Sequence, residues 1–581
     1  MTGSARRSWP TSRSGWHAGI TGSASVMEAS GQVDPEILGM HFLGADQPEK
    51  ARVHLARAAD QAAERWRSER AAALYRFALE LPSGEDNQGS SAPAWATRAG
   101  QRGARRRGRR GFLRGAPGHA LAGPRPPPAG GHAVADQRPH GRGLDTLRAV
   151  LAKVGMSLPA TPRRALASLL WQRARIRWRG LSFRERTEDD IPQPELNRID
   201  VCWSASVGLS VVDTVRGADF QARGLLLALD AGEPGRIARA LAMEAAHSAS
   251  LGTSNRRQTE RLLQIADDLG RRVEHPYATG MATLARGVAS YLEGRWTEAQ
   301  QFCDRAEAIF RDRCTGVAWE LNTANAFSLW GLSHQGEIAE LSRRWPVLLA
   351  QARERGNLYA AMNLSSYLMS IVKLAADDPA AAREGLRETA ARWSRQGYHV
   401  QHNDALWAAV QTELYRGDGV AAWETLDRSW PLLRGSLLLR VQFIRTSMRF
   451  LRARAALAAS AAIRRGDPRR ARTLLASASR DARRLRRESM PCADAYARMI
   501  EGAVAALGGD HARGVRLLDE AAAAFDGVDM RLCAAAARRR RGELLGGDAG
   551  RGEVAQSEVW MAGQGIQAPS RMAAMILTEP N

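Results

Sequence analysis

Apolar and small residues recur every three or four positions along most of the chain, a period that predicts helices. The clearest example lies at residues 287–310, where Gly287 and Ala299 are small and Trp296 is large. Two helices that cross closely need small residues at the crossing point and bulky ones beside it. Gly294 stands between the two helical patterns and is expected to end the first helix in a left-handed conformation. This stretch therefore predicts a helical hairpin.

Turn signals of the same kind recur through the second half of the chain. They lie at Gly294, Gly336, Asp377, Gly417, Gly466 and Gly509, at spacings of 42, 41, 40, 49 and 43 residues. A standard tetratricopeptide unit has about 34 residues, so each hairpin needs longer helices or a longer return loop. The pattern predicts an all-α fold, a tetratricopeptide-like α-solenoid of stacked helical hairpins.

Helical periodicity divides the chain into four parts. Residues 28–86 predict helical hairpins, and residues 143–581 predict the main solenoid. Residues 1–27 and 87–142 lack helical periodicity, and the second of these segments is rich in arginine, glycine and proline. We expect both segments to be disordered, the second as an insert. We also hypothesise that residues 87–142 are translated from a shifted reading frame, because a GC-rich coding strand read out of frame yields these residue types.

The net charge of +22 is concentrated outside the predicted helices. Residues 87–142 contain eleven arginines and one acidic residue, Asp136, and residues 1–27 add three arginines. Only Lys50, Lys153 and Lys373 are lysines, so arginine supplies nearly all of the positive charge. This distribution disfavours nucleic acid as the partner of the helical body. The insert alone motivates an alternative, an RNA- or DNA-associated protein that binds through its arginines.

The cysteines and the hydropathy of the sequence indicate the cellular compartment in which the protein is expected. The five cysteines are scattered and form no Cys-x-x-Cys pair, which predicts buried free thiols and neither a disulfide framework nor a thiolate metal site. No run of about 18 apolar residues predicts a membrane span, and the N-terminal residues lack the apolar core of a secretory signal. We therefore expect a cytoplasmic protein.

The motifs of common enzyme classes are absent from the sequence. No lysine follows a glycine as a phosphate-binding loop requires, and the ordered motifs of a protein kinase do not occur. His399 and His402 are three residues apart with Asp404 close by, but a zinc site needs further ligands. Polar residues at a helix start or in a groove are the favoured interpretation. We expect no enzyme activity, cofactor or metal.

Four strings go beyond generic repeat patterns. They are RGADFQARGLLLAL at 216–229, ARGVASYLEGRWTEA at 285–299, RCTGVAWELNTAN at 313–325 and QGIQAPSRMAAM at 564–575. Together they resemble the C-terminal tetratricopeptide-like tail of large multidomain bacterial serine/threonine protein kinases of the myxobacterial and planctomycete type. In that family a kinase domain and a signalling ATPase module precede the tail.

The resemblance covers residues 28–86 and 143–581 and carries over no catalytic residue, since the kinase and ATPase portions are absent here. It implies a sensor or scaffold tail that receives a signal or partner and regulates the ATPase and kinase. Kinase or ATPase modules encoded nearby are then expected partners.

The sequence thus predicts a repeat region for protein–protein interaction, with a protein or peptide ligand on the concave face of the solenoid. The alternative of nucleic-acid binding through the insert predicts loss of affinity and of salt dependence when residues 87–142 are deleted. Candidate partner-binding residues combine polar and aromatic side chains on two hairpins. They are Trp319, Asn322, Asn325, Tyr359, Asn363, His399, His402 and Trp407.

Overall fold

A computed structural model describes residues 47–64, 147–148, 150–152, 154–209, 213–354, 357–365, 367–391 and 398–579. The chain divides into an N-terminal unit, residues 1–136, and a C-terminal unit, residues 137–581. The N-terminal unit contributes α3 (Pro48–Glu64), with Ala51, Leu55 and Ala58 buried on one face. The other predicted helices of residues 28–86, and the segments 1–27 and 87–142, lie outside the described residues.

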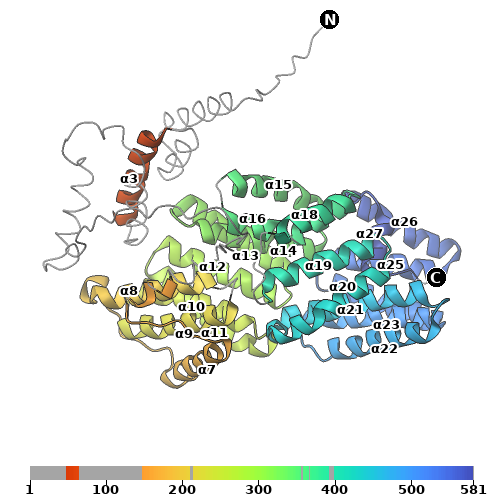
Figure 1. Ribbon diagram of the computed structural model, residues 1–581, viewed down its shortest axis with the longest axis horizontal. Helices are drawn as coiled ribbons and strands as arrows, with labels where there is room; N and C mark the ends of the chain where they lie inside the picture. Colours follow the sequence, from red (N-terminus) through yellow and green to blue (C-terminus); the bar gives the residue numbers. More distant parts are fainter. Residues whose placement is uncertain are drawn as a thin grey trace, which may run out of the picture. The chain divides into compact units, whose positions relative to one another are not determined.

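The described part of the C-terminal unit is built from helices, without strands (Figure 1). The α-helices are α7 (Pro162–Arg179), α8 (Gln193–Leu209), α9 (Thr214–Ala231), α10 (Pro234–Ala249), α11 (Arg256–Arg272), α12 (Pro276–Leu292), α13 (Trp296–Arg313), α14 (Ala318–Gln335), α15 (Ile338–Glu354), α16 (Leu358–Leu364), α17 (Tyr367–Ala375), α18 (Pro379–Ala391), α19 (Val400–Tyr415), α20 (Gly419–Gly435), α21 (Gln442–Ile463), α22 (Pro468–Leu485), α23 (Pro491–Leu507), α24 (His511–Asp526), α25 (Arg531–Leu545), α26 (Gly547–Gly563) and α27 (Pro569–Ile576). Short 3-10 turns lie at Glu188–Asp190, Thr253–Asn255 and Leu438–Arg440.

Consecutive helices pack as antiparallel pairs, which confirms the predicted tetratricopeptide-like solenoid of hairpins. The α12/α13 hairpin begins at Pro276 and the next one at Ala318, 42 residues later. The repeat is long because each of these helices has 17 or 18 residues. One hairpin departs from the pattern, because its first helix is divided into the short helices α16 and α17.

Glycine and aspartate build the turns inside the hairpins. Gly294 and Gly417 have φ values of 82° and 79°, a left-handed conformation that glycine adopts without steric cost. After Gly417 an aspartate caps the next helix, since Asp418 accepts a hydrogen bond from the Ala421 N–H at 2.9 Å, and Asp467 caps α22 in the same way by accepting one from the Arg470 N–H at 3.0 Å. These caps satisfy N–H groups that the first turn of a helix leaves unpaired.

The helices of a hairpin cross where a small residue allows it. A Cβ atom placed on Gly287 of α12 would lie 2.5 Å from the Cys303 Sγ atom of α13. Cys303 and Ala299 are fully buried, and Trp296 is 1 % exposed. The sequence-based interpretation of this hairpin is therefore confirmed in its contacts.

The C-terminal segment anchors on helices far from it in sequence. The Gln567 N–H donates to the Ala375 carbonyl at 2.8 Å. Two buried arginines also bind backbone carbonyls near the end of the chain: Arg454 donates to Met575 and Arg540 donates to Leu577. These charged hydrogen bonds hold α27 against the body of the solenoid.

The helices α9–α14 and the helices α16–α21, which we call the two halves of the solenoid, also contact each other. The Gln442 N–H at the start of α21 donates to the Ser250 carbonyl at 3.2 Å, and the Gln442 Oε1 atom accepts from the Thr253 N–H at 2.8 Å. Nearby, the Tyr291 and Phe443 rings lie 4.8 Å apart. The start of α21 therefore contacts the segment after α10 and the end of α12.

Most of the cysteines and tryptophans among the described residues are part of the packing, and free thiols were predicted for the cysteines. Cys202, Cys303 and Cys492 are buried free thiols, and Cys314 and Cys533 are half-buried. Trp296 and Trp345 are buried in the core. None of the described helices is both long and apolar enough to span a membrane.

Candidate functional site

A cavity of about 320 Å³ lies where the two halves of the solenoid face each other. Its volume is at the lower end of the range for small-ligand pockets. We call it the central cavity. Its wall comes mainly from α10, α12, α14, α19 and α21, with single residues of α9, α16 and α17. It is lined by Thr214, Ala242, Met243, Ala246, His247, Ser250, Met281, Leu284, Ala285, Val288, Tyr291, Leu292, Trp319, Thr323, Phe327, Trp330, His334, Asn363, Tyr367, Val400, Gln401, Asn403, Asp404, Trp407, Val441, Phe443, Ile444 and Ser447.

One face of α14 supplies a continuous strip of this wall. Trp319, Thr323, Phe327, Trp330 and His334 follow one another at intervals of four, four, three and four residues. This spacing places all five side chains on the same side of a helix. The rings of Phe327 and Trp330 pack edge to face with their centroids 4.9 Å apart. The strip therefore presents a rigid aromatic surface to the cavity.

An aromatic cluster closes one end of the cavity. The Tyr291 ring packs against Phe327, Trp296 and Phe443 at centroid distances of 5.2, 5.5 and 4.8 Å. The His334 ring stacks on Trp296 at 4.2 Å, and its Nε2 atom lies 3.3 Å from the Tyr291 hydroxyl. Burial lowers the pKa of His334 to about 3, so this imidazole is neutral at physiological pH.

Asp404, in the first turns of α19, is the only acidic residue among the described lining residues. Asn403, Asp404 and Trp407 lie on one face of this helix with Val400. Burial raises the pKa of Asp404 to about 7, and a hydrogen bond from Asn403 opposes this effect only in part. The Trp407 ring packs edge to face against Tyr367, whose hydroxyl lies 2.7 Å from the Ser333 hydroxyl.

The wall also holds polar atoms that the fold does not use. Within the described residues, the Nε1 atoms of Trp319 and Trp407, the Nε2 atom of His247, the Oγ1 atom of Thr323 and the Oδ1 atom of Asn403 are buried without a hydrogen-bond partner. A buried polar group left unpaired costs roughly 1–3 kcal/mol. Five such atoms on residues of one cavity are typical of a binding surface more than of a core.

The structure brings three of the eight sequence-predicted contact residues to this cavity, namely Trp319, Asn363 and Trp407. Asn322 and Asn325 are half-buried on α14 and are not among the lining residues. Tyr359 belongs to α16, and its side chain lies outside the described part of the chain. The binding role of these residues stays a prediction.

His399 and His402 flank the cavity at the start of α19. The His402 Nδ1 atom accepts a hydrogen bond from the His399 backbone N–H at 3.1 Å, and the two rings are 5.7 Å apart. This is the geometry of polar residues at a helix start. Among the described residues, no three His, Cys, Asp or Glu side chains come together as a metal site requires.

Sequence reasoning missed several lining residues, some on α14 and α19 beside the predicted ones and others on α10, α12, α17 and α21. They are His247, Tyr291, Phe327, Trp330, His334, Tyr367, Asn403, Asp404 and Phe443. The spacing of the α14 strip was a signal for four of the wall positions. Tyr291 and Phe443 lie 152 residues apart in the sequence, and nothing local in the sequence indicates that they meet.

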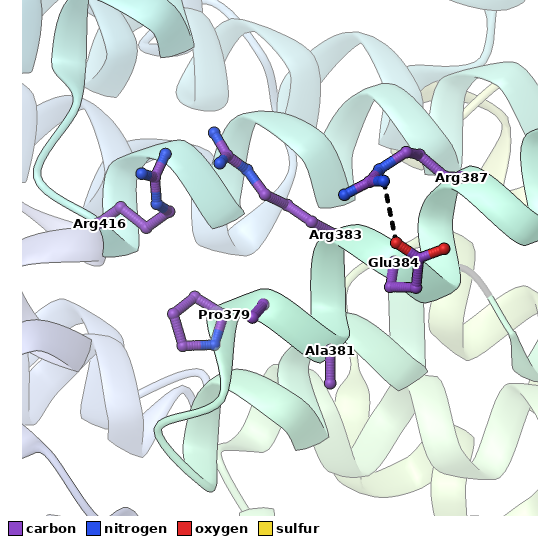
Figure 2. Close-up of a pocket in the computed structure, with 7 residues that line it drawn as sticks. Pro379, Ala381, Arg383, Glu384, Arg387 and Arg416 are labelled. Atoms are coloured by element: carbon purple, nitrogen blue, oxygen red, sulfur yellow. Dashed lines mark ion pairs between the residues drawn. The ribbon is translucent and has the colours of Figure 1, made fainter.

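A second hollow, of about 500 Å³, lies on the surface at the start of α18 (Figure 2). Arg383, Arg387 and Arg416 line it and would suit an anion. Each arginine is already paired, however: Arg383 and Arg416 with Glu413 at 2.6 and 2.8 Å, and Arg387 with Glu384 at 2.9 Å. The central cavity is therefore the stronger candidate for a ligand site.

No protein-family model and no curated protein matches the sequence. Among solved structures, the apo form of the quorum sensor NprR from B. thuringiensis aligns with 60% of this chain and 98% of its own length. The sequence identity is 12% and the TM-score is 0.32. A similarity this low transfers neither a ligand nor a role, so the architecture of this chain rests on its own helices.

Proposed function

We propose that the C-terminal unit is a protein-interaction or sensor region that binds a peptide segment of a partner in the central cavity. The observation that carries the proposal is the cavity itself, which lies between helices distant in the sequence and is lined by seven aromatic side chains of the kinds that dominate binding energies. They are Tyr291, Trp319, Phe327, Trp330, Tyr367, Trp407 and Phe443.

The wall suits a peptide in two respects. Its apolar and aromatic area can bury side chains, and its unpaired Trp319, Thr323 and Asn403 atoms can exchange hydrogen bonds with peptide groups after small rotations. A volume of about 320 Å³ admits a few side chains and excludes a folded domain. The ligand is therefore a short segment or a chain end.

A peptide selected from a random displayed library against the full chain provides the test. Calorimetry should then show that Trp407→Leu lowers the affinity for the peptide by at least about tenfold, since the substitution removes an aromatic side chain from the wall. Trp178→Leu is the matched control, because Trp178 on α7 is 89 % exposed and far from the lining set. Equal affinity for Trp407→Leu and the parent chain, or a loss only with Trp178→Leu, would place the peptide elsewhere and contradict the proposal.

We further propose that binding regulates a serine/threonine kinase and its signalling ATPase module. The four strings that resemble the tails of such kinases support this step. Sequencing the encoding DNA and its surroundings should reveal kinase and ATPase motifs, and helical sequence in another frame of residues 87–142. A locus with neither would make the chain an independent repeat protein.

A further inference from the structure

The charge of the central cavity is one-sided. Asp404 is its only acidic residue, and no arginine or lysine lines it among the described residues. A carboxylate in such a wall is usually paired with a cationic side chain, because an unpaired buried charge is costly. Here burial instead raises the pKa of the carboxyl to about 7. The cavity wall thus provides a carboxyl group without a cationic partner among the described lining residues.

The other titratable groups among the described lining residues do not supply a positive charge to pair with Asp404. Burial lowers the pKa of His247 on α10 and of His334 on α14 to about 3, so both rings are neutral. The pKa values of Tyr291 on α12 and Tyr367 on α17 are raised by burial, with a further contribution from the charge of Asp404. The lining residues of α21 do not titrate. Because no described lining residue provides a cation, we expect the positive charge that pairs with Asp404 inside the cavity to come from a ligand.

Aromatic rings line the same cavity wall as this carboxyl. Tyr367 and Trp407 are in edge-to-face contact at 6.2 Å, and Trp407 follows Asp404 by one helical turn. Tyr291 links this group to Phe443 and to Trp330, at 4.8 and 5.9 Å. The electron-rich faces of Trp and Tyr attract cations, most strongly where water is excluded.

From this arrangement we propose that the central cavity binds an organic ammonium group, with the Asp404 carboxylate as its counter-ion and the surrounding aromatic rings as its cage. The inference rests on the proposed function only in using the same cavity. The ammonium can belong to a lysine side chain or amino terminus of the bound peptide, or to a free amine. An anionic ligand is disfavoured, since Asp404 would repel it and no described lining residue would pair with it.

Choline and its neutral isostere 3,3-dimethylbutan-1-ol separate charge from shape, because they differ only in the replacement of nitrogen by carbon. Calorimetry on the full chain at pH 8, where the carboxyl is ionised, should show choline binding at least about tenfold more tightly than the alcohol, or about 1.4 kcal/mol. Equal binding of the two probes, or no binding of choline, would overturn the inference without any variant.

Two variants then locate the effect. Asp404→Asn should reduce the preference for choline to the smaller part contributed by the aromatic rings and leave the affinity for the alcohol unchanged. Glu424→Gln, an exposed carboxylate of α20, should change neither affinity. An undiminished preference for choline in Asp404→Asn would assign the counter-ion to another site and overturn the proposal.

The source of the ammonium is tested with a library-selected peptide that contains one lysine and its acetyl-lysine counterpart. A loss of at least about tenfold on acetylation identifies the peptide as the carrier, whereas equal affinities together with Asp404-dependent choline binding identify a free amine. If peptides bind the cavity but choline does not, the ammonium inference fails and the proposed function stands. If choline binds through Asp404 but no peptide occupies the cavity, the ammonium inference stands and the proposed function fails.

Discussion

At the scale of single residues, the buried ionisable groups of the central cavity give the protein a distinctive pH response. Asp404 favours its proton in the folded chain, because burial raises its pKa from 3.8 to about 7. His247 and His334 behave in the opposite way, since burial lowers their pKa values from 6.5 to about 3. The carboxyl therefore destabilises the fold towards neutral pH, and the imidazoles destabilise it towards acid.

The substitution Asp404→Asn isolates the carboxyl. Between pH 4 and 7 the folded parent chain keeps a proton that the unfolded chain has released, so its free energy of unfolding falls as the pH rises. The variant lacks this slope and should be more stable than the parent at pH 8 by up to roughly 4 kcal/mol, with little difference near pH 4. Denaturant unfolding at several pH values measures this difference. A constant difference at all pH values would show that Asp404 does not titrate as described.

Gly287 tests the close crossing of α12 and α13. An alanine Cβ would overlap the Cys303 Sγ atom, so Gly287→Ala should lower the free energy of unfolding by about 1–3 kcal/mol. The matched control is Gly552→Ala on α26, where no atom lies within 4 Å of the added Cβ, and it should stabilise the chain by up to about 1 kcal/mol. Thermal denaturation of both variants compares the two sites, and similar shifts would contradict the crossing geometry.

At the scale of elements, the hairpins were predictable because their determinants are local. Gly294 and Gly417 end helices, and aspartates such as Asp467 start the next ones within two or three residues. The division of one helix into α16 and α17 was not predictable, because the apolar pattern continues through both. Trp296 and Trp330 illustrate the limit within an element: both follow helical spacing, yet one is core and the other lines a cavity.

The aspartate caps offer a prediction for one element. Asp467→Ala removes the acceptor for the Arg470 N–H and should cost about 1 kcal/mol, because Asp467 is exposed and packs little. The effect should be local in a solenoid, where each hairpin interacts mainly with its neighbours. Hydrogen exchange should therefore accelerate at the start of α22 and stay unchanged in α10. Uniform acceleration through the whole unit would contradict the solenoid description of its stability.

At the scale of the whole molecule, the candidate site depends on contacts between helices that are far apart in the sequence. The relative position of distant helices depends on the small rotations accumulated between successive hairpins. No local sequence pattern determines this accumulated rotation. This is why Asn363 and Trp407 could be proposed from the sequence while their partners Tyr291 and Phe443 could not. The contacts of Gln442 with Ser250 and Thr253 join segments 189 or more residues apart.

Substitution of Gly252 tests the contact between Gly252 and Gln442, and Gly509 provides the control. Its φ of 94° matches the 91° of Gly509, so alanine costs about 1–2 kcal/mol of backbone strain at either site. Only at Gly252 would the new Cβ overlap the Gln442 side chain. Gly252→Ala should therefore weaken peptide binding by at least about tenfold, whereas Gly509→Ala should leave it unchanged. Equal effects of the two variants on affinity would mean that this contact does not shape the cavity.

The most direct test of the central claim is a methyl spectrum of the methionines in the full chain during titration with the selected peptide. Met243 and Met281 line the central cavity, whereas Met499 and Met572 are buried elsewhere. Binding in the cavity predicts that the signals of Met243 and Met281 shift to saturation while those of Met499 and Met572 stay in place. Saturation of the peptide with Met243 and Met281 unmoved would contradict the assignment of this cavity as the binding site.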